Sequence, residues 1–284
     1  MAELLEKTNM APRIEIVAAE AVDKDFLTQI RTWANEVLER TASPAPYLCV
    51  TVWKTLEKLQ AYYREEKEAL GVITGEETDF LATHDAWRGY PRIHICEERV
   101  EGIPSAIVQG VVHHEISHAL QHGTQEFYTF RFSSHLQEVG RTYGLDLAHL
   151  QQCVYFLSVA IKDWEGVQGL AEKGLAFSQV ALLEHLISDT DEERQVWEVV
   201  RGNSALRTIA LAAFLKTLLP IEAMVSVGIE EAQALRNRWE EAYRWLPQGE
   251  REALFRLAQI SRKRERKTFQ ERLEQAALRL IIQF

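Results

Sequence analysis

The hydrophobic period of the chain changes near residue 104, and this change limits the folds that the chain can adopt. Before that point, four short segments alternate apolar and polar residues or cluster β-branched ones, as strands do. Segments with the apolar spacing of helices separate them, and after residue 104 helical spacing dominates. The pattern predicts an α+β protein with a small mixed first part and a larger helical second part.

The expected strands and helices can be placed approximately along the chain. Strands are predicted at residues 13–17, 47–53, 80–83 and 92–96. Helices are predicted at about 25–40, 52–70, 104–122, 133–143, 146–188, 190–219, 221–246 and 248–281. We expect a single domain, residues 1–284, with a mixed lobe at 1–123 and a helical lobe at 124–284, because one core can still grow at this length.

The composition is that of an ordinary soluble globular protein. The 284 residues carry 42 acidic side chains against 32 lysines and arginines, a net charge of −10, and 46% of them are hydrophobic. A protein that binds nucleic acid or an anionic membrane would need a basic face, so we expect neither partner. A basic run at residues 262–267 is typical of the solvated face of a late helix.

Cysteine usage and the start of the chain predict a cytoplasmic protein. Cys49, Cys96 and Cys153 are widely spaced and odd in number, which fits neither a disulfide framework nor a CxxC metal site. The first residues lack the basic-then-apolar order of a secretory signal. The most apolar later stretch, residues 208–228, is interrupted by a lysine, a proline and a glutamate, so no membrane span is expected.

The most specific motif, His113-His114-Glu115-Ile116-Ser117-His118, lies inside the helix predicted at 104–122. His114 and His118 are four residues apart, so one helical face presents two imidazoles to a single ion. Glu115 projects from an adjacent position, where it can reach a water at the metal. The spacing is typical of a metalloprotease, and the position of the motif in a helix that follows a strand and a turn supports this interpretation.

On these residues the chain resembles the zincin metallopeptidases, and more narrowly the gluzincins, in which two motif histidines and a later helical glutamate hold zinc. The resemblance is specific over residues 111–123 and loose over about 90–190, where the order is strand, metal helix and helical lobe. It implies a zincin-like fold with a twisted sheet and an active-site helix between two lobes. A metzincin is excluded, because Gln121 and Thr124 stand where that pattern requires Gly and His.

A catalytic zinc needs a third protein ligand, which must come from later in the chain. We predict Glu165, because Gly166 and Gly169 flank its side of a helix and would let another helix approach closely. Asp163 lies about 200° from Glu165 around that helix, so the two carboxylates cannot both face one ion. Asp163 is therefore the first alternative. Further candidates are Glu126, Glu138, Glu172, His185 and Asp189.

Other residues near the motif receive structural interpretations. His113 and His122 are predicted to lie off the ligand face of the helix. His94 lies in the strand predicted at 92–96, which could pair with an extended peptide substrate, and its side chain is expected to face solvent or the cleft. Tyr128 and Tyr155 are candidate donors to an oxyanion, although tyrosines more often belong to a core or its boundary.

The sequence therefore predicts a zinc metallopeptidase that hydrolyses the peptide bonds of a peptide or protein substrate. His114, His118 and Glu165 would hold the ion, and Glu115 would take a proton from the attacking water and return it to the leaving amine. Two alternatives stay open: a metal-dependent hydrolase of a small molecule, and a non-catalytic helical protein-binding module on a zincin scaffold. The C-terminal helices, with their aromatic side chains, also offer a face for a homodimer.

Overall fold

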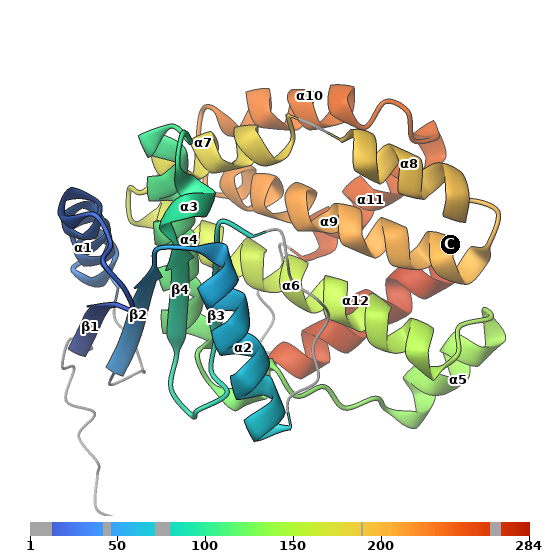
Figure 1. Ribbon diagram of the computed structural model, residues 1–284. Coiled ribbons are helices and arrows are strands. Elements are labelled where there is room, and N and C mark those ends of the chain that lie inside the picture. The colour runs from blue at the N-terminus through green and yellow to red at the C-terminus, as the bar shows by residue number, and fades with distance from the viewer. Residues whose placement is uncertain (1–12, 42–46, 72–79, 189, 262–267) are drawn as a thin grey trace, which may run out of the picture. The chain divides into compact units, whose positions relative to one another are not determined.

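The computed structural model describes residues 13–41, 47–71, 80–188, 190–261 and 268–284. The chain divides into two compact units, Met1–Gln125 and Glu126–Phe284. The first contains a four-stranded mixed sheet, and the second is helical (Figure 1). The protein is thus α+β, as the change of period predicts. The basic run at 262–267 lies outside the described residues.

The sheet of the first unit has the strand order β1-β2-β4-β3. Its strands are β1 Arg13–Ala18, β2 Tyr47–Trp53, β3 Ala82–Asp85 and β4 Arg92–Cys96. β1, β2 and β4 run parallel, and β3 pairs antiparallel with β4. All four predicted strands are therefore present. The expectation that β4 could pair with a peptide is wrong, because β4 is hydrogen-bonded to β2 on one side and β3 on the other. Beyond β4, β3 is the edge strand of the described sheet.

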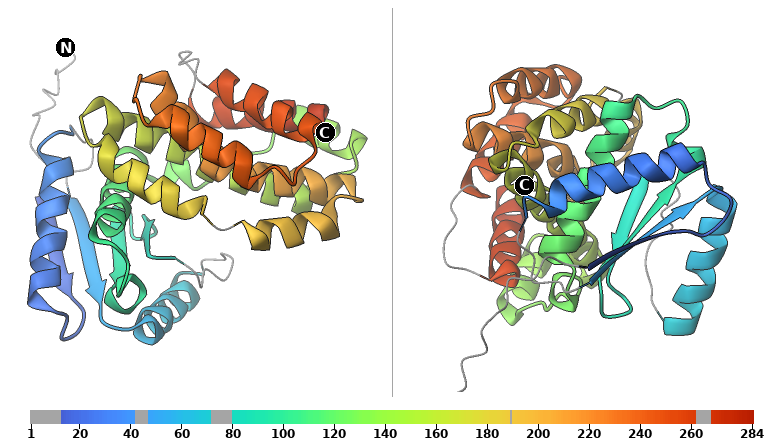
Figure 2. Two further views of the ribbon diagram at one scale, coloured as in Figure 1. Left: turned by 90° about the horizontal axis from the view of Figure 1, so that it is seen from above. Right: turned by 90° about the vertical axis from the view of Figure 1, so that its left-hand side faces the viewer.

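Helices cover both faces of this sheet (Figure 2). The helices of the first unit are α1 Lys24–Leu38, α2 Leu56–Leu70, α3 Glu97–Val100 and α4 Ser105–His122. α1 packs against α4, and α4 also contacts β3 and β4, whereas α2 contacts β2 and β4. α4 ends at Gly123, where a Cβ atom would lie 2.2 Å from the carbonyl oxygen of Ala119 and 2.7 Å from Pro91 Cβ. Only glycine fits there, so the predicted C-terminal cap is confirmed.

A buried ion network fastens α2 to the sheet. The guanidinium group of Arg92 donates to Glu66 Oε2 at 2.5 Å and to Asp85 Oδ1 at 2.7 Å. Arg88 adds a bond to Glu66 Oε1 at 2.6 Å. Burial alone would raise the pKa of Glu66, but the hydrogen bonds from Arg92 and Arg88 outweigh it and lower that pKa to about 2. The network fixes the end of β3 through Asp85, which is buried.

The second unit contains eight described helices around a large apolar core. They are α5 Ser134–Thr142, α6 Leu147–Glu172, α7 Ala176–Leu186, α8 Asp191–Val200, α9 Ser204–Ser226, α10 Ala232–Ala242, α11 Gln248–Ser261 and α12 Phe269–Gln283. α6 and α9 lie side by side along most of their length (Figure 1). The C-terminal aromatic residues Trp239 and Tyr243 are buried in this core.

Several predicted helix boundaries in this unit are wrong. The segments predicted as single helices at 190–219 and 221–246 are interrupted at residues 201–203 and 227–231. The helix predicted at 146–188 is interrupted at Gly174, whose φ of 76° ends α6 and lets the chain turn into α7. The break predicted at Pro220 is absent, because α9 continues through it. Proline removes one backbone hydrogen bond, but α9 packs against α6, α8, α10 and α11, and this burial offsets the cost.

α9 is long and apolar enough to cross a membrane by length and composition alone. However, 78% of its most apolar window is buried inside the protein. This burial is consistent with the core helix of a soluble protein.

Candidate metal centre

α4 brings His114 and His118 together as the four-residue spacing predicts. Their Nε2 atoms are 2.9 Å apart, and the two rings are almost perpendicular, with an interplanar angle of 88°. Two imidazole nitrogens that each lie 2.0–2.1 Å from a tetrahedral zinc would be about 3.3 Å apart, so a small ring rotation would admit the ion. His118 is buried and His114 half-buried. The pair has the convergence that a metal site requires.

His122 holds the opposite side of the His118 ring. The Nδ1 atoms of His118 and His122 are 3.2 Å apart, and His122 is buried. One of the two nitrogens must carry the hydrogen. If His118 donates, its Nε2 atom keeps a lone pair on the side of His114, which is the tautomer that binds a metal. His122 thus contacts the side of the candidate ligand His118 that is turned away from His114, a role that spacing alone did not suggest.

Glu115 is held by a residue that the sequence did not single out, His84. Glu115 Oε2 lies 2.6 Å from His84 Nδ1, and the two side chains are 13% and 15% exposed. The ring of His84 also stacks on that of His118, with centroids 4.6 Å apart and an interplanar angle of 22°. His84 belongs to β3, which packs on α4. It therefore contacts both the candidate base and a candidate ligand.

His113 and His94 have structural roles in the first unit. His113 is buried, and its Nε2 atom lies 3.1 Å from Glu36 Oε2 of α1; burial lowers the pKa of His113 although Glu36 opposes the shift. His94 is also buried, and its Nδ1 accepts a hydrogen bond of 3.0 Å from Trp53 Nε1. The expectation that His94 faces solvent or a cleft is wrong, because β4 is an inner strand beneath α2.

In the second unit, α6 carries both carboxylates considered as the third ligand. Glu165 Oε1 lies 2.5 Å from Arg272 Nη2 of α12, and the Glu165 side chain is 15% exposed. Asp163 is buried. A carboxylate that accepts from a guanidinium group has fewer lone pairs to offer a cation. Glu165 stays a prediction, but this ion pair favours Asp163.

The remaining candidates are less suited to a site. Glu126, Glu138 and Glu172 are exposed, and Asp189 lies outside the described residues. His185 is half-buried near the end of α7. Tyr155 is 46% exposed, whereas the Tyr128 ring lies under the ammonium group of Lys162, with Nζ 4.6 Å from its centroid.

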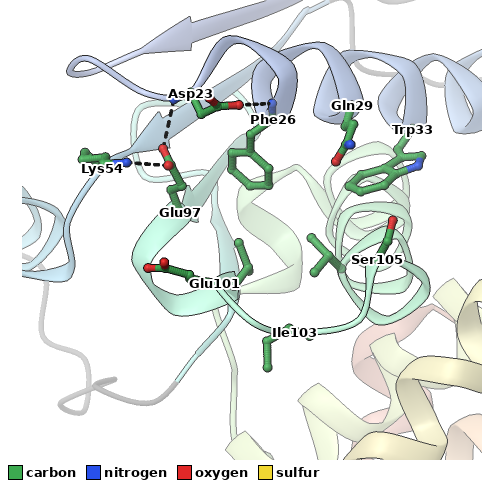
Figure 3. A pocket seen from close by; sticks show the side chains of 11 residues that line it. Asp23, Phe26, Gln29, Trp33, Lys54, Glu97, Glu101, Ile103 and Ser105 are labelled. Carbon is green, nitrogen blue, oxygen red and sulfur yellow. Dashed lines mark hydrogen bonds and ion pairs between the residues drawn. The ribbon is translucent and has the colours of Figure 1, made fainter.

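A separate cavity of about 300 Å³ lies at the other end of α4 (Figure 3). Phe26 and Trp33 of α1 point into the cavity, and Ser105 at the start of α4 also lines it. On its charged rim, Lys54 donates to Glu97 at 2.5 Å. Ser105 is nine residues from His114, or about 14 Å along the helix axis. The cavity is therefore distinct from the histidine cluster.

No protein-family model, curated protein or solved structure matches this chain. Its function is therefore inferred from the chemistry of the residues described above.

Proposed function

We propose that this protein is a zinc metallopeptidase of the zincin type that hydrolyses peptide bonds. The convergence of the His114 and His118 Nε2 atoms, 2.9 Å apart beside Glu115, is the observation that carries the proposal. A zinc ion held there would supply Lewis acidity toward a water and a carbonyl oxygen. Glu115 would accept a proton from the attacking water and pass it to the leaving amine.

We assign the third ligand to α6. Histidine and carboxylate side chains are ligands that catalytic zinc uses, and α6 carries two carboxylates, Asp163 and Glu165. Glu165 remains the residue that the zincin resemblance favours, but its ion pair with Arg272 makes Asp163 the better candidate. These donor types fit zinc better than calcium or magnesium, which prefer oxygen ligands.

The position of β3 supports a peptide substrate. β3 is at the edge of the described sheet and packs on α4, the helix that carries the histidines. An extended peptide can add to such an edge by main-chain hydrogen bonds, which would bring its carbonyl groups near α4. A small-molecule substrate would make no use of this edge. The role first expected of β4 therefore passes to β3.

The presence of Glu115 favours a catalytic protein over the non-catalytic binding module. A purely structural zinc has no need of a general base, yet Glu115 lies between the two histidines in sequence and is largely enclosed, with 13% of its side chain exposed. We also propose a cytoplasmic location, since Cys49, Cys96 and Cys153 are free thiols. A homodimer through the C-terminal helices remains a proposal.

The test combines metal analysis with a digestion. Protein purified without chelator is expected to contain about one zinc ion per chain and to cleave members of a broad peptide library, with products identified by mass spectrometry. Glu115→Gln should keep the zinc and lose cleavage, because it removes the base but leaves the ligands. Zinc without cleavage by the wild type would support the binding module, and protein that binds no zinc would reject the proposal.

A further inference from the structure

We propose that His84 is a positioning residue that holds the Glu115 carboxylate in place for proton transfer. This role deepens the proposed hydrolase function and rests on it. An ionised carboxylate can only accept hydrogen bonds, so in the 2.6 Å contact His84 Nδ1 carries the hydrogen and donates to Glu115 Oε2. The bond fixes the hydrogen-bearing nitrogen of His84 as well as the carboxylate.

The backbone of His84 is itself firmly held. In the antiparallel ladder His84 pairs with Ile93 of β4, an inner strand of the sheet. The next residue, Asp85, accepts from Arg92 Nε at 2.9 Å and from Arg92 Nη2 at 2.7 Å. This charge-assisted fork anchors the end of β3. The sheet therefore holds His84 in place, and His84 in turn holds the Glu115 carboxylate.

The ring of His84 makes a second contact that restricts its own rotation. It stacks on the ring of His118 with centroids 4.6 Å apart, while Nδ1 faces Glu115. The stacking on His118 thus fixes the plane of the His84 ring, and the bond to Glu115 fixes the direction in which Nδ1 points. Glu115 and His118 are three residues apart in α4, so one side chain of β3 contacts both the proposed base and a proposed ligand.

Holding Glu115 from β3 would serve the reaction because β3 is also the edge on which we place the peptide. β3 would then position both the Glu115 carboxylate and the backbone of the bound peptide, which fixes the distance over which Glu115 transfers the proton. Loss of His84 would leave Glu115 free to adopt other rotamers. Removal of such an orienting partner typically costs 10–100-fold in activity.

Two amide substitutions separate this hydrogen bond from simple packing. The amide nitrogen of Asn can occupy the place of Nδ1, whereas that of Gln reaches the place of Nε2. On a peptide found by the library digestion, His84→Ala and His84→Gln should lower kcat about 10–100-fold with little change in KM. His84→Asn should restore most of kcat. His149→Ala, a histidine substitution outside the described site, is the matched control.

A measurement on metal-free protein tests the same bond without any turnover. In protein labelled with ¹⁵N at histidine, the His84 resonances are assigned as those lost in His84→Asn. His84 Nδ1 is expected to be the protonated ring nitrogen, and its resonance should move in Glu115→Gln. Unchanged His84 ring resonances in Glu115→Gln, or equal kcat for the Asn and Gln variants, would overturn the proposal. If the wild type cleaves no peptide, the proposed function fails, and the resonances still decide the role of His84.

Discussion

His118 and His122 face each other through their Nδ1 atoms at 3.2 Å, one helical turn apart on α4. Both rings are buried, so water cannot replace the hydrogen bond between the two Nδ1 atoms, and breaking that bond would cost free energy. The contact sets the direction of the His118 ring and leaves its Nε2 atom for His114. In the proposed centre, His122 would therefore orient His118 as a ligand.

Replacing His122 should weaken zinc binding without abolishing it. His122→Phe keeps a ring of similar shape but cannot accept from His118, so zinc affinity should fall about 10–100-fold. His122→Asn keeps an acceptor and should lose less. Competition with a chromophoric chelator measures the affinities. Equal affinity in wild type and His122→Phe would show that the His118 ring needs no partner.

Substituting either ligand histidine should have a larger effect. His114→Ala and His118→Ala each leave at most two protein ligands, so the purified variants should contain little zinc by elemental analysis. His149→Ala should retain about one zinc per chain, because His149 lies outside the cluster. Zinc at the wild-type level in a His114→Ala/His118→Ala double variant would contradict the proposed centre.

The third ligand can be decided by a matched pair on α6. Asp163→Ala should lower zinc affinity by orders of magnitude, because it removes a direct ligand. Glu165→Ala should change the affinity far less and should instead leave Arg272 without its partner, which destabilises the second unit. The opposite order, with zinc lost only in Glu165→Ala, would restore the ligand that the zincin resemblance favours.

Local patterns in the sequence predicted the strands and the helical nature of the second unit, but not the division of that unit into eight described helices. Alternation and β-branched clusters located all four strands, and apolar spacing located the helical part. The order of strands is not a local property, which is why β4 was expected at an edge that β3 occupies. The helix break predicted at Pro220 is wrong, because burial on several sides of α9 outweighs the hydrogen bond that proline removes.

In the candidate site, too, local sequence patterns predict some residues, whereas others depend on how distant segments pair. The proposed ligands His114 and His118 and the proposed base Glu115 follow from spacing within one helix, because i and i+4 residues share a face. His84 is 31 residues from Glu115 and reaches it only through strand pairing. The available signal was alternation in β3, which puts Ala82 and His84 on one face. Without the strand order, nothing connected that face to α4.

The acid sensitivity of the first unit should depend on Glu66. Its pKa of about 2 lies below the ordinary value of 4.5, because hydrogen bonds from Arg92 and Arg88 outweigh the effect of burial. A lowered carboxyl pKa stabilises the folded state above the ordinary pKa, and this stabilisation is lost as the pH falls toward the folded pKa. At about 1.4 kcal/mol per pKa unit, the contribution is on the order of 3 kcal/mol, lost between roughly pH 5 and pH 2.

Glu66→Gln should therefore lower the free energy of unfolding at pH 7 by about 3 kcal/mol, since it removes one of the two carboxylates that accept from the buried Arg92 and leaves only Asp85. Between pH 5 and pH 2 the variant should lose less stability than the wild type, because it no longer has this group to protonate. Urea unfolding at several pH values, followed by tryptophan fluorescence, measures both effects. Glu68→Gln, an exposed substitution on the same helix, should follow the wild-type curve. Parallel pH curves for wild type and Glu66→Gln would show that the Glu66–Arg92 pair does not set the acid sensitivity of this unit.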